Sequence, residues 1–251
     1  MKGLKENILF VIALCIITIL IHFLVGLLKI RGRFKERDLE KFPRQKNTIV
    51  FTNHPDGGEW FFIYRRFLKL RYLLFPLLFL YKTPYVVADQ TNFDKPIIRI
   101  IKERIIRIDR NPTGTQSRAS SFRKCISLLE KGRGIIGFFE GCRTYNAKEQ
   151  FYSEKKNLPI GKINRSLGLL AKQPKVKVKI GGINFDNKVI TSLKDDGSFS
   201  VSRLIRWYKE TLFGNNGGIS LVWGELKEFN GSPEEITQEV ENYTLKLMDM
   251  T

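Results

Sequence analysis

The stretch FTNHPDGGEW, residues 51–60, places a histidine in a turn between a strand-like apolar run and a carboxylate. His54 is one of 2 histidines in 251 residues, and Glu59 follows it at the start of an aromatic run. A carboxylate at this position can accept the Nδ1–H bond of the ring, which fixes the tautomer and leaves Nε2 as a general base. Asp56 in the same turn is an alternative partner. A surface histidine in a polar turn is the competing interpretation.

Two further stretches end in charged residues that suit an anion. RIIRIDR ends a strand-like run with Arg107 and Arg110, and GFFEGCRTY ends another with Glu140 and Arg143. Guanidinium groups grip phosphate oxygens in pairs, and Gly141 permits close approach of the backbone. Each stretch alone is compatible with an ordinary charged strand end. Because working residues of α/β sheets gather where strands end, the three stretches together predict a base beside a phosphate pocket.

Short β-branched or aromatic segments must position these residues. The segments that predict strands are 47–53, 84–89, 104–109, 134–140, 175–185 and 219–226. Between two of them, residues 115–132 carry apolar side chains at helical spacing and end at a glycine, which predicts a helix. The alternation predicts an α/β fold, with one domain built on a mostly parallel, helix-flanked sheet.

A membrane anchor is predicted at the N-terminus. Residues 8–28 carry no charge and are long enough to cross a hydrocarbon core of about 30 Å, so we expect an uncleaved transmembrane helix. More basic residues follow this run than precede it, which predicts that the rest of the chain lies on the cytoplasmic side. We therefore divide the chain into an anchor with a basic flank, 1–37, and a catalytic domain, 38–251. His22 inside the run is interpreted as a packed, weakly hydrogen-bonded or merely tolerated residue, with a functional role as the alternative.

The charge balance implies an anionic partner. Lys and Arg number 43 against 25 Asp and Glu, a net charge of +18. Residues 64–82 mix cations with a short apolar run and predict an interfacial segment on an anionic membrane surface, with a buried helix as the alternative. The chain has no recognisable nucleic-acid motif, so we expect no nucleic-acid partner. The scattered cysteines predict neither a metal site nor a cofactor.

Four ordered motifs, NHPDGGE, RIDR, FFEGCRT and VKVKI, resemble those of the glycerolipid acyltransferases, typified by 1-acylglycerol-3-phosphate acyltransferase. That family carries N-H-x-x-S-x-x-D, F-I-D-R, F-P-E-G-T-R-S and a V-P-V-like strand in the same order. The resemblance runs from about residue 47 to 185. It implies the family fold and a membrane-bound O-acyltransferase of phospholipid biosynthesis. The acyl chain would pass from acyl-CoA or acyl-carrier protein to a lysophospholipid, converting 1-acylglycerol-3-phosphate to phosphatidic acid.

The resemblance also implies roles for individual residues, without a metal or covalent intermediate. His54 would be the base, oriented by the carboxylate of Glu59. Four residues would bind the acceptor's phosphate or shape its pocket: Arg110, Glu140, Gly141 and Arg143.

The chain departs from the family pattern at several positions. Glu59 replaces the usual Asp, Phe139 stands where Pro is usual, and Cys142 stands where Thr is usual. A cysteine beside Arg143 would suit a nucleophile, but its place in a motif that normally has Thr favours direct attack by the acceptor hydroxyl. These departures leave open another lyso-lipid or glycolipid as acceptor, and a catalytically inactive lipid-binding scaffold.

Overall fold

The computed structural model describes residues 2–42, 47–55, 59–76, 82–89, 104–108, 115–140, 144, 147–186, 200–214 and 217–251. Its strands are β1 (Phe34–Asp38), β2 (Thr48–Thr52), β3 (Tyr85–Asp89), β4 (Ile105–Ile108), β5 (Ile135–Gly137), β6 (Gln150–Tyr152), β7 (Pro159–Gly161), β8 (Lys177–Phe185) and β9 (Ile219–Lys227). Its helices are α1 (Lys2–Ile30), α2 (Glu59–Arg65), the 3-10 helix η1 (Leu70–Leu73), α5 (Thr115–Glu130), α6 (Arg165–Ala171), α7 (Val201–Phe213) and α8 (Pro233–Asp249).

Seven strands form one sheet in the order β1-β9-β8-β2-β5-β3-β4. Neighbouring strands run parallel except β8 and β9, which pair antiparallel. The predicted α/β class with a mostly parallel sheet is therefore confirmed. All six predicted strand segments contain a strand, whereas β1 and the small antiparallel pair β6–β7 were not predicted.

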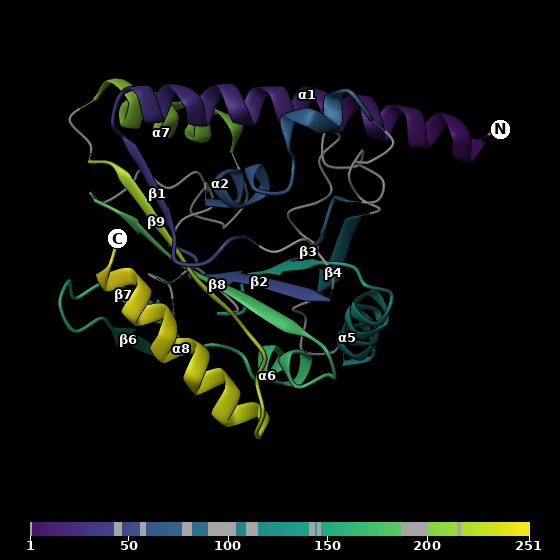
Figure 1. Ribbon diagram of the computed structural model, residues 1–251, viewed down its shortest axis with the longest axis vertical. Coiled ribbons are helices and arrows are strands. Elements are labelled where there is room, and N and C mark those ends of the chain that lie inside the picture. The colour runs from purple at the N-terminus through teal and green to yellow at the C-terminus, as the bar shows by residue number, and fades with distance from the viewer. Residues whose placement is uncertain are drawn as a thin grey trace.

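The central position of β2 in the sheet explains why its sequence is uniformly apolar or β-branched. TIVFT is buried at all five positions, because β8 and β5 flank it and helices cover both faces. Its side chains alternate between two cores: Val50 packs with α2 and α7, while Ile49 and Phe51 pack with α5, α6 and α8. Figure 1 shows the same division, with α1, α2 and α7 on one side of the sheet and α5, α6 and α8 on the other.

Helix α1 lies along the domain and contacts α2, β1, η1 and α7 (Figure 1). Within it, Ile8–Ile30 is long and apolar enough, by length and composition, to cross a membrane. His22 has a partner from outside the helix, since its Nε2 lies 2.7 Å from the carbonyl oxygen of Leu68. Tyr208 of α7 donates a hydrogen bond of 2.7 Å to the carbonyl oxygen of Leu24.

Strand β1 joins the predicted anchor to the sheet. It pairs in parallel with β9 from Phe34, opposite Ile219, to Asp38, opposite Trp223. The division at residues 37 and 38 thus falls within a strand that is hydrogen-bonded into the sheet. Its sequence FKERD is mostly charged and half-exposed or exposed, as suits a strand at the edge.

Candidate active site

His54 follows the carboxyl end of β2 and is held there by the residue before it. The buried side chain of Asn53 bonds both backbone groups of Ile183 in β8: Nδ2 donates to the carbonyl oxygen at 2.9 Å, and Oδ1 accepts from the amide at 2.8 Å. This paired bond replaces the strand ladder where β2 ends. The chain therefore leaves the sheet in a defined direction, which places the histidine at the sheet edge.

The backbone of His54 is also bound on the side of β5. Its amide donates to Oε1 of Glu140 at 2.6 Å, and its carbonyl oxygen accepts from the amide of Thr144 at 2.9 Å. Because β2 and β5 are parallel neighbours, the segments after them meet at one edge of the sheet. The structure thus brings together two of the residues singled out in the sequence, His54 and Glu140.

Glu140 binds three donors from separate parts of the chain. Besides the His54 amide, its Oε2 accepts from the hydroxyl of Thr144 at 2.7 Å and from the amide of Gly161 in β7 at 2.6 Å. The carboxylate is 6% exposed. Burial raises its pKa to about 7, while the hydrogen bonds from Thr144, Gly161 and His54 act in the opposite direction. Both carboxylate oxygens face donors, so Glu140 is a positioning residue for the turn that carries His54.

Gly161 is required at its position by this close approach. A Cβ atom there would lie 2.8 Å from Oε2 of Glu140 and 2.8 Å from Cβ of Ala147. No side chain fits without moving the carboxylate or the neighbouring backbone. The short strand β7, absent from the sequence expectations, therefore contributes directly to holding the site.

The imidazole ring of His54 stacks on the phenyl ring of Phe138. Their centroids are 4.3 Å apart and their planes are inclined by 21°. Both side chains are half-buried, so the ring is restrained on one face while part of it remains accessible. Stacking of this kind stabilises one ring orientation, as a general base requires.

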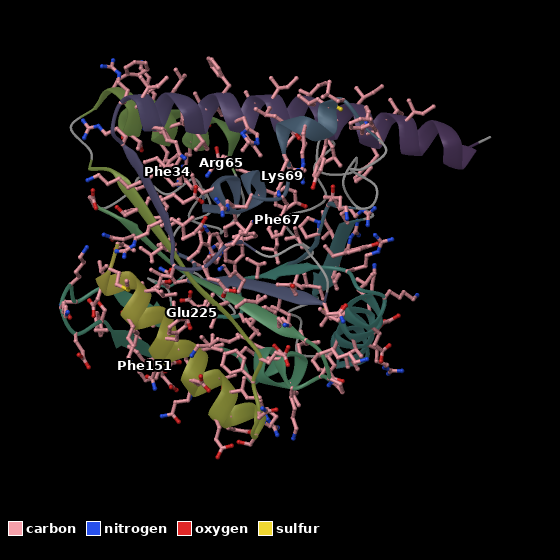
Figure 2. The ribbon with its side chains drawn as sticks, in the orientation of Figure 1. Phe34, Arg65, Phe67, Lys69, Phe151 and Glu225 are labelled. Atoms are coloured by element: carbon pink, nitrogen blue, oxygen red, sulfur yellow. The ribbon has the colours of Figure 1, made fainter. Side chains whose placement is uncertain are left out.

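Helix α2 begins at Glu59, and aromatic and ionic contacts near its C-terminal end fix its position. Phe62 stacks on Phe34 of β1 with centroids 4.7 Å apart, and Arg65 forms an ion pair with Glu36. Arg65 also lies over the Phe34 ring at 5.7 Å. Figure 2 shows Phe34 and Arg65 in the layer beneath α1. The start of α2 is thereby placed after the turn, whereas the side chain of Glu59 lies outside the described part of the structure.

Several predicted site residues lie outside the described residues. They are Asp56, Arg110, Gly141, Cys142 and Arg143. The structure therefore describes the strands and turns that lead to them, and their roles stay predictions.

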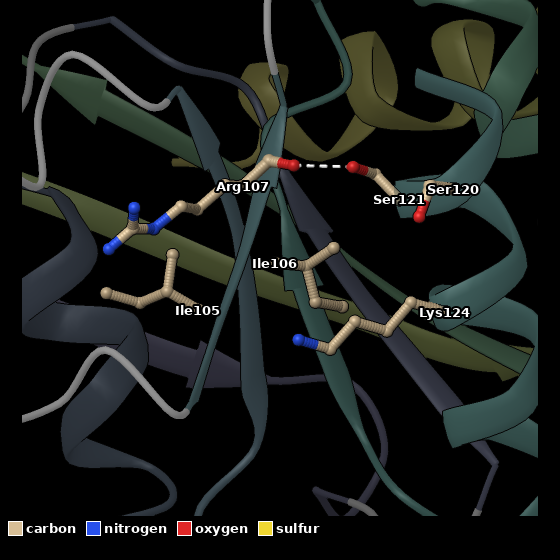
Figure 3. Close-up of a pocket in the computed structure, with 6 residues that line it drawn as sticks. All are labelled: Ile105, Ile106, Arg107, Ser120, Ser121 and Lys124. Carbon is tan, nitrogen blue, oxygen red and sulfur yellow. Dashed lines mark hydrogen bonds between the residues drawn. The ribbon is translucent and has the colours of Figure 1, made fainter. Parts of the chain in front are cut away.

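Arg107 is described, and it lies in another part of the sheet. With Ile105, Ile106, Ser120, Ser121 and Lys124 it lines a cavity of about 340 Å³ between β4 and α5 (Figure 3). The hydroxyl of Ser121 donates to the Arg107 carbonyl oxygen at 2.5 Å. Strands β5 and β3 separate β4 from β2 in the sheet, a distance of about 14 Å at the usual strand spacing. Arg107 and His54 thus end parallel strands at the same edge without being neighbours.

Sequence reasoning missed Asn53, Phe138 and Thr144. Asn53 had a signal, because it precedes the histidine in the first motif and amides commonly bond free backbone groups at strand ends. Phe138 and Thr144 had none, because their contacts with His54 join the segments that follow two different strands.

The described side chains contain no group of three or more His, Cys, Asp or Glu that could hold a metal ion. A scan against models of known protein families finds no match, and a search of curated proteins finds none. The described residues hold a partly accessible imidazole at the carboxyl ends of parallel strands, with the amide and the carbonyl oxygen of His54 both hydrogen-bonded. This arrangement suits a general base.

Proposed function

We propose that this protein is a membrane-bound O-acyltransferase with the glycerolipid acyltransferase fold. It transfers a fatty acyl chain from acyl-CoA or acyl-carrier protein to a lysophospholipid, with 1-acylglycerol-3-phosphate as acceptor and phosphatidic acid as product. The observation that carries the proposal is the binding of the His54 backbone, after β2, by Glu140 and Thr144, after β5, with the His54 ring stacked on Phe138. That arrangement suits a base at a sheet edge where substrates enter.

The chemistry needs little besides a positioned base. As the acceptor hydroxyl attacks the thioester carbonyl, Nε2 of His54 takes its proton, and a tetrahedral oxyanion forms. The carbon–sulfur bond then breaks, and the proton passes to the departing thiolate. General base catalysis of this type contributes roughly 10²–10⁴-fold. Glu59 is proposed to orient the ring through Nδ1, from the first turn of α2.

The acceptor phosphate is proposed to bind Arg110 and Arg143, with Gly141 allowing close approach. Glu140 contributes indirectly, because its carboxylate accepts hydrogen bonds from the His54 amide and from the hydroxyl of Thr144, which follows residues 141–143. Arginine pairs bind phosphate with two hydrogen bonds each, which suits an acceptor that carries a terminal phosphate. The domain is proposed to lie on the cytoplasmic side of the membrane, held there by α1.

The test is acyl transfer by purified protein in detergent. Acyl-CoA and acyl-carrier donors are combined with a panel of lyso-lipids and glycolipids, and thiol release is measured beside lipid products by mass spectrometry. We expect His54→Ala to abolish transfer. His22→Ala, which removes the other histidine, is the matched control and should retain it. Transfer to a different acceptor would revise the substrate, and no transfer by folded protein would favour a lipid-binding scaffold.

A further inference from the structure

The side of α1 that faces away from the domain is apolar along its length. Large apolar side chains are 49% or more exposed there: Ile8, Leu9, Ile12, Ile16, Ile19, Leu20, Phe23 and Ile30. A helix on the surface of a soluble domain normally turns polar residues outward. The outward face of α1 therefore requires an apolar environment that the described part of the chain does not supply.

The opposite side of α1 is packed against the domain. Five residues along it are at most 3% exposed: Phe10, Leu14, Ile21, Val25 and Leu28. From Phe10 to Leu28 the helix rises about 27 Å, which is close to the thickness of a hydrocarbon core. The domain thus accompanies the helix over nearly the whole length that would have to cross a membrane.

This packing is incompatible with an upright helix. The elements in contact with α1 carry exposed cations: Arg71 in η1, and Arg206 and Lys209 in α7. They also include the half-buried ion pair of Arg65 with Glu36. If α1 stood across the bilayer with its present contacts, these charges would enter the hydrocarbon, which costs several kcal/mol for each.

The neighbours of α1 extend its apolar surface. Near η1, Leu74 and Phe75 are 78% and 64% exposed, and in α7 Ile205 and Phe213 are 62% and 66% exposed. The Arg31 guanidinium lies 5.5 Å from the Phe213 ring, which places the end of α7 beside the end of α1. Exposed cations accompany these side chains, as is typical of segments that insert apolar groups below anionic headgroups.

We propose that α1 lies in the plane of the membrane, with its outward face in one anionic leaflet and the domain packed along its inward face. The chain would then bind one side of the bilayer instead of spanning it, in contrast to the expectation from length and composition. The arrangement specifies the proposed membrane location further and does not require acyl transfer. The in-plane arrangement and the proposed acyltransferase activity can therefore be disproved separately.

The test measures insertion depth at three positions on the outward face. Ile8→Cys, Ile19→Cys and Ile30→Cys are made singly in a chain whose native cysteines are replaced by alanine, and each is labelled with an environment-sensitive fluorophore. The labelled proteins are bound to phosphatidylcholine–phosphatidylglycerol vesicles, and depth is read from quenching by lipids brominated at defined carbons. Lys131→Cys, exposed at the far end of α5, is the unquenched control.

An in-plane helix places all three labels at one shallow depth. A spanning helix places position 19 about 16 Å deeper than position 8 or 30, and that profile would overturn the proposal. Failure to bind vesicles would also overturn the proposal, including the case where a second copy covers α1 in solution.

Arg71→Glu with Lys209→Glu should weaken binding to phosphatidylglycerol vesicles at least tenfold and leave any binding to pure phosphatidylcholine unchanged. Equal loss on both vesicles would contradict the anionic leaflet. His54→Ala should give the wild-type depth profile.

Discussion

The amide of His54 donates a hydrogen bond of 2.6 Å to Oε1 of Glu140, although the two residues are 86 positions apart. The proposed base is therefore held by a carboxylate that contacts its backbone, at the end of the neighbouring strand. Activity should consequently depend on Glu140 even though it need not touch a substrate.

Removing the Glu140 carboxylate should destabilise the domain. Glu140→Ala leaves the buried amides of His54 and Gly161 and the Thr144 hydroxyl without their acceptor, at a cost of roughly 2–4 kcal/mol. Urea unfolding in detergent measures the free energy change. Thr144→Ser keeps the hydroxyl and serves as a control that should lose less than about 1 kcal/mol. Equal losses of unfolding free energy in Glu140→Ala and Thr144→Ser would refute the assignment of Glu140 as the acceptor that stabilises the site.

The pKa of Glu140 predicts how stability varies with pH. Burial raises it to about 7 from an ordinary value of 4.5, so the folded protein binds this proton more tightly than the unfolded chain. The corresponding stability is fully present below about pH 4.5 and is lost as the pH rises through about 7. Glu140→Gln cannot titrate. The free energy of unfolding of the wild type, relative to this variant, should therefore fall between these pH values, and parallel curves would contradict the prediction.

Replacing Phe138 should reduce activity more than stability. Phe138→Leu removes the ring that stacks on His54 while keeping an apolar side chain at a half-buried position. We expect kcat to fall by about 10-fold, equivalent to about 1.4 kcal/mol of lost orientation, with KM for the acceptor unchanged. Steady-state kinetics and thermal unfolding are measured together. A rise in KM at constant kcat would show that Phe138 binds substrate.

Asn53 should be sensitive to a nearly isosteric change. Asn53→Asp keeps an acceptor for the Ile183 amide but loses the donor to the Ile183 carbonyl oxygen, and it buries a charge. We expect a loss of roughly 2–3 kcal/mol of stability together with loss of acyl transfer. Asn164→Asp is the matched control and should fold normally, because this exposed side chain accepts from the Ser166 amide through an oxygen that Asp retains.

Deleting residues 1–37 should not yield a well-behaved soluble domain. The deletion removes α1 and most of β1, exposes the edge of β9 and opens the core around Trp207 and Trp223. We expect aggregation, seen as loss of a monomer peak in gel filtration. Deleting only residues 1–6 removes no described core residue and is the control.

Local sequence patterns predicted much of the fold. Strands β2 and β8 are β-branched and buried, so their composition identifies them. Strand β1 escaped notice because FKERD is mostly charged, and its pairing with β9 is a long-range contact that no local pattern contains. The antiparallel pairing of β9 with β8 was also missed, because the direction of a strand relative to its neighbour is not contained in a local pattern.

The candidate site also has features that the sequence predicted and features that it did not. His54 stands out as a rare residue type in a turn, and Glu140 follows a clear strand. Glu140 was expected in the phosphate pocket, but its bonds to the His54 and Gly161 amides depend on how three segments meet in space. Arg107, grouped with the same site by its strand end, lies on β4, which β5 and β3 separate from β2.

The pairing of β1 with β9 has a consequence for synthesis. Helix α1 and β1 are made before the rest of the sheet, and β9 is the last strand of the sheet to be made. Throughout most of translation β1 has no partner strand and the inward face of α1 has only part of its core. Residues 8–28 of nascent α1 therefore have no packed side when α1 emerges, and if α1 reaches a membrane at that stage, the proposed in-plane arrangement requires folding of the domain to withdraw one side from lipid.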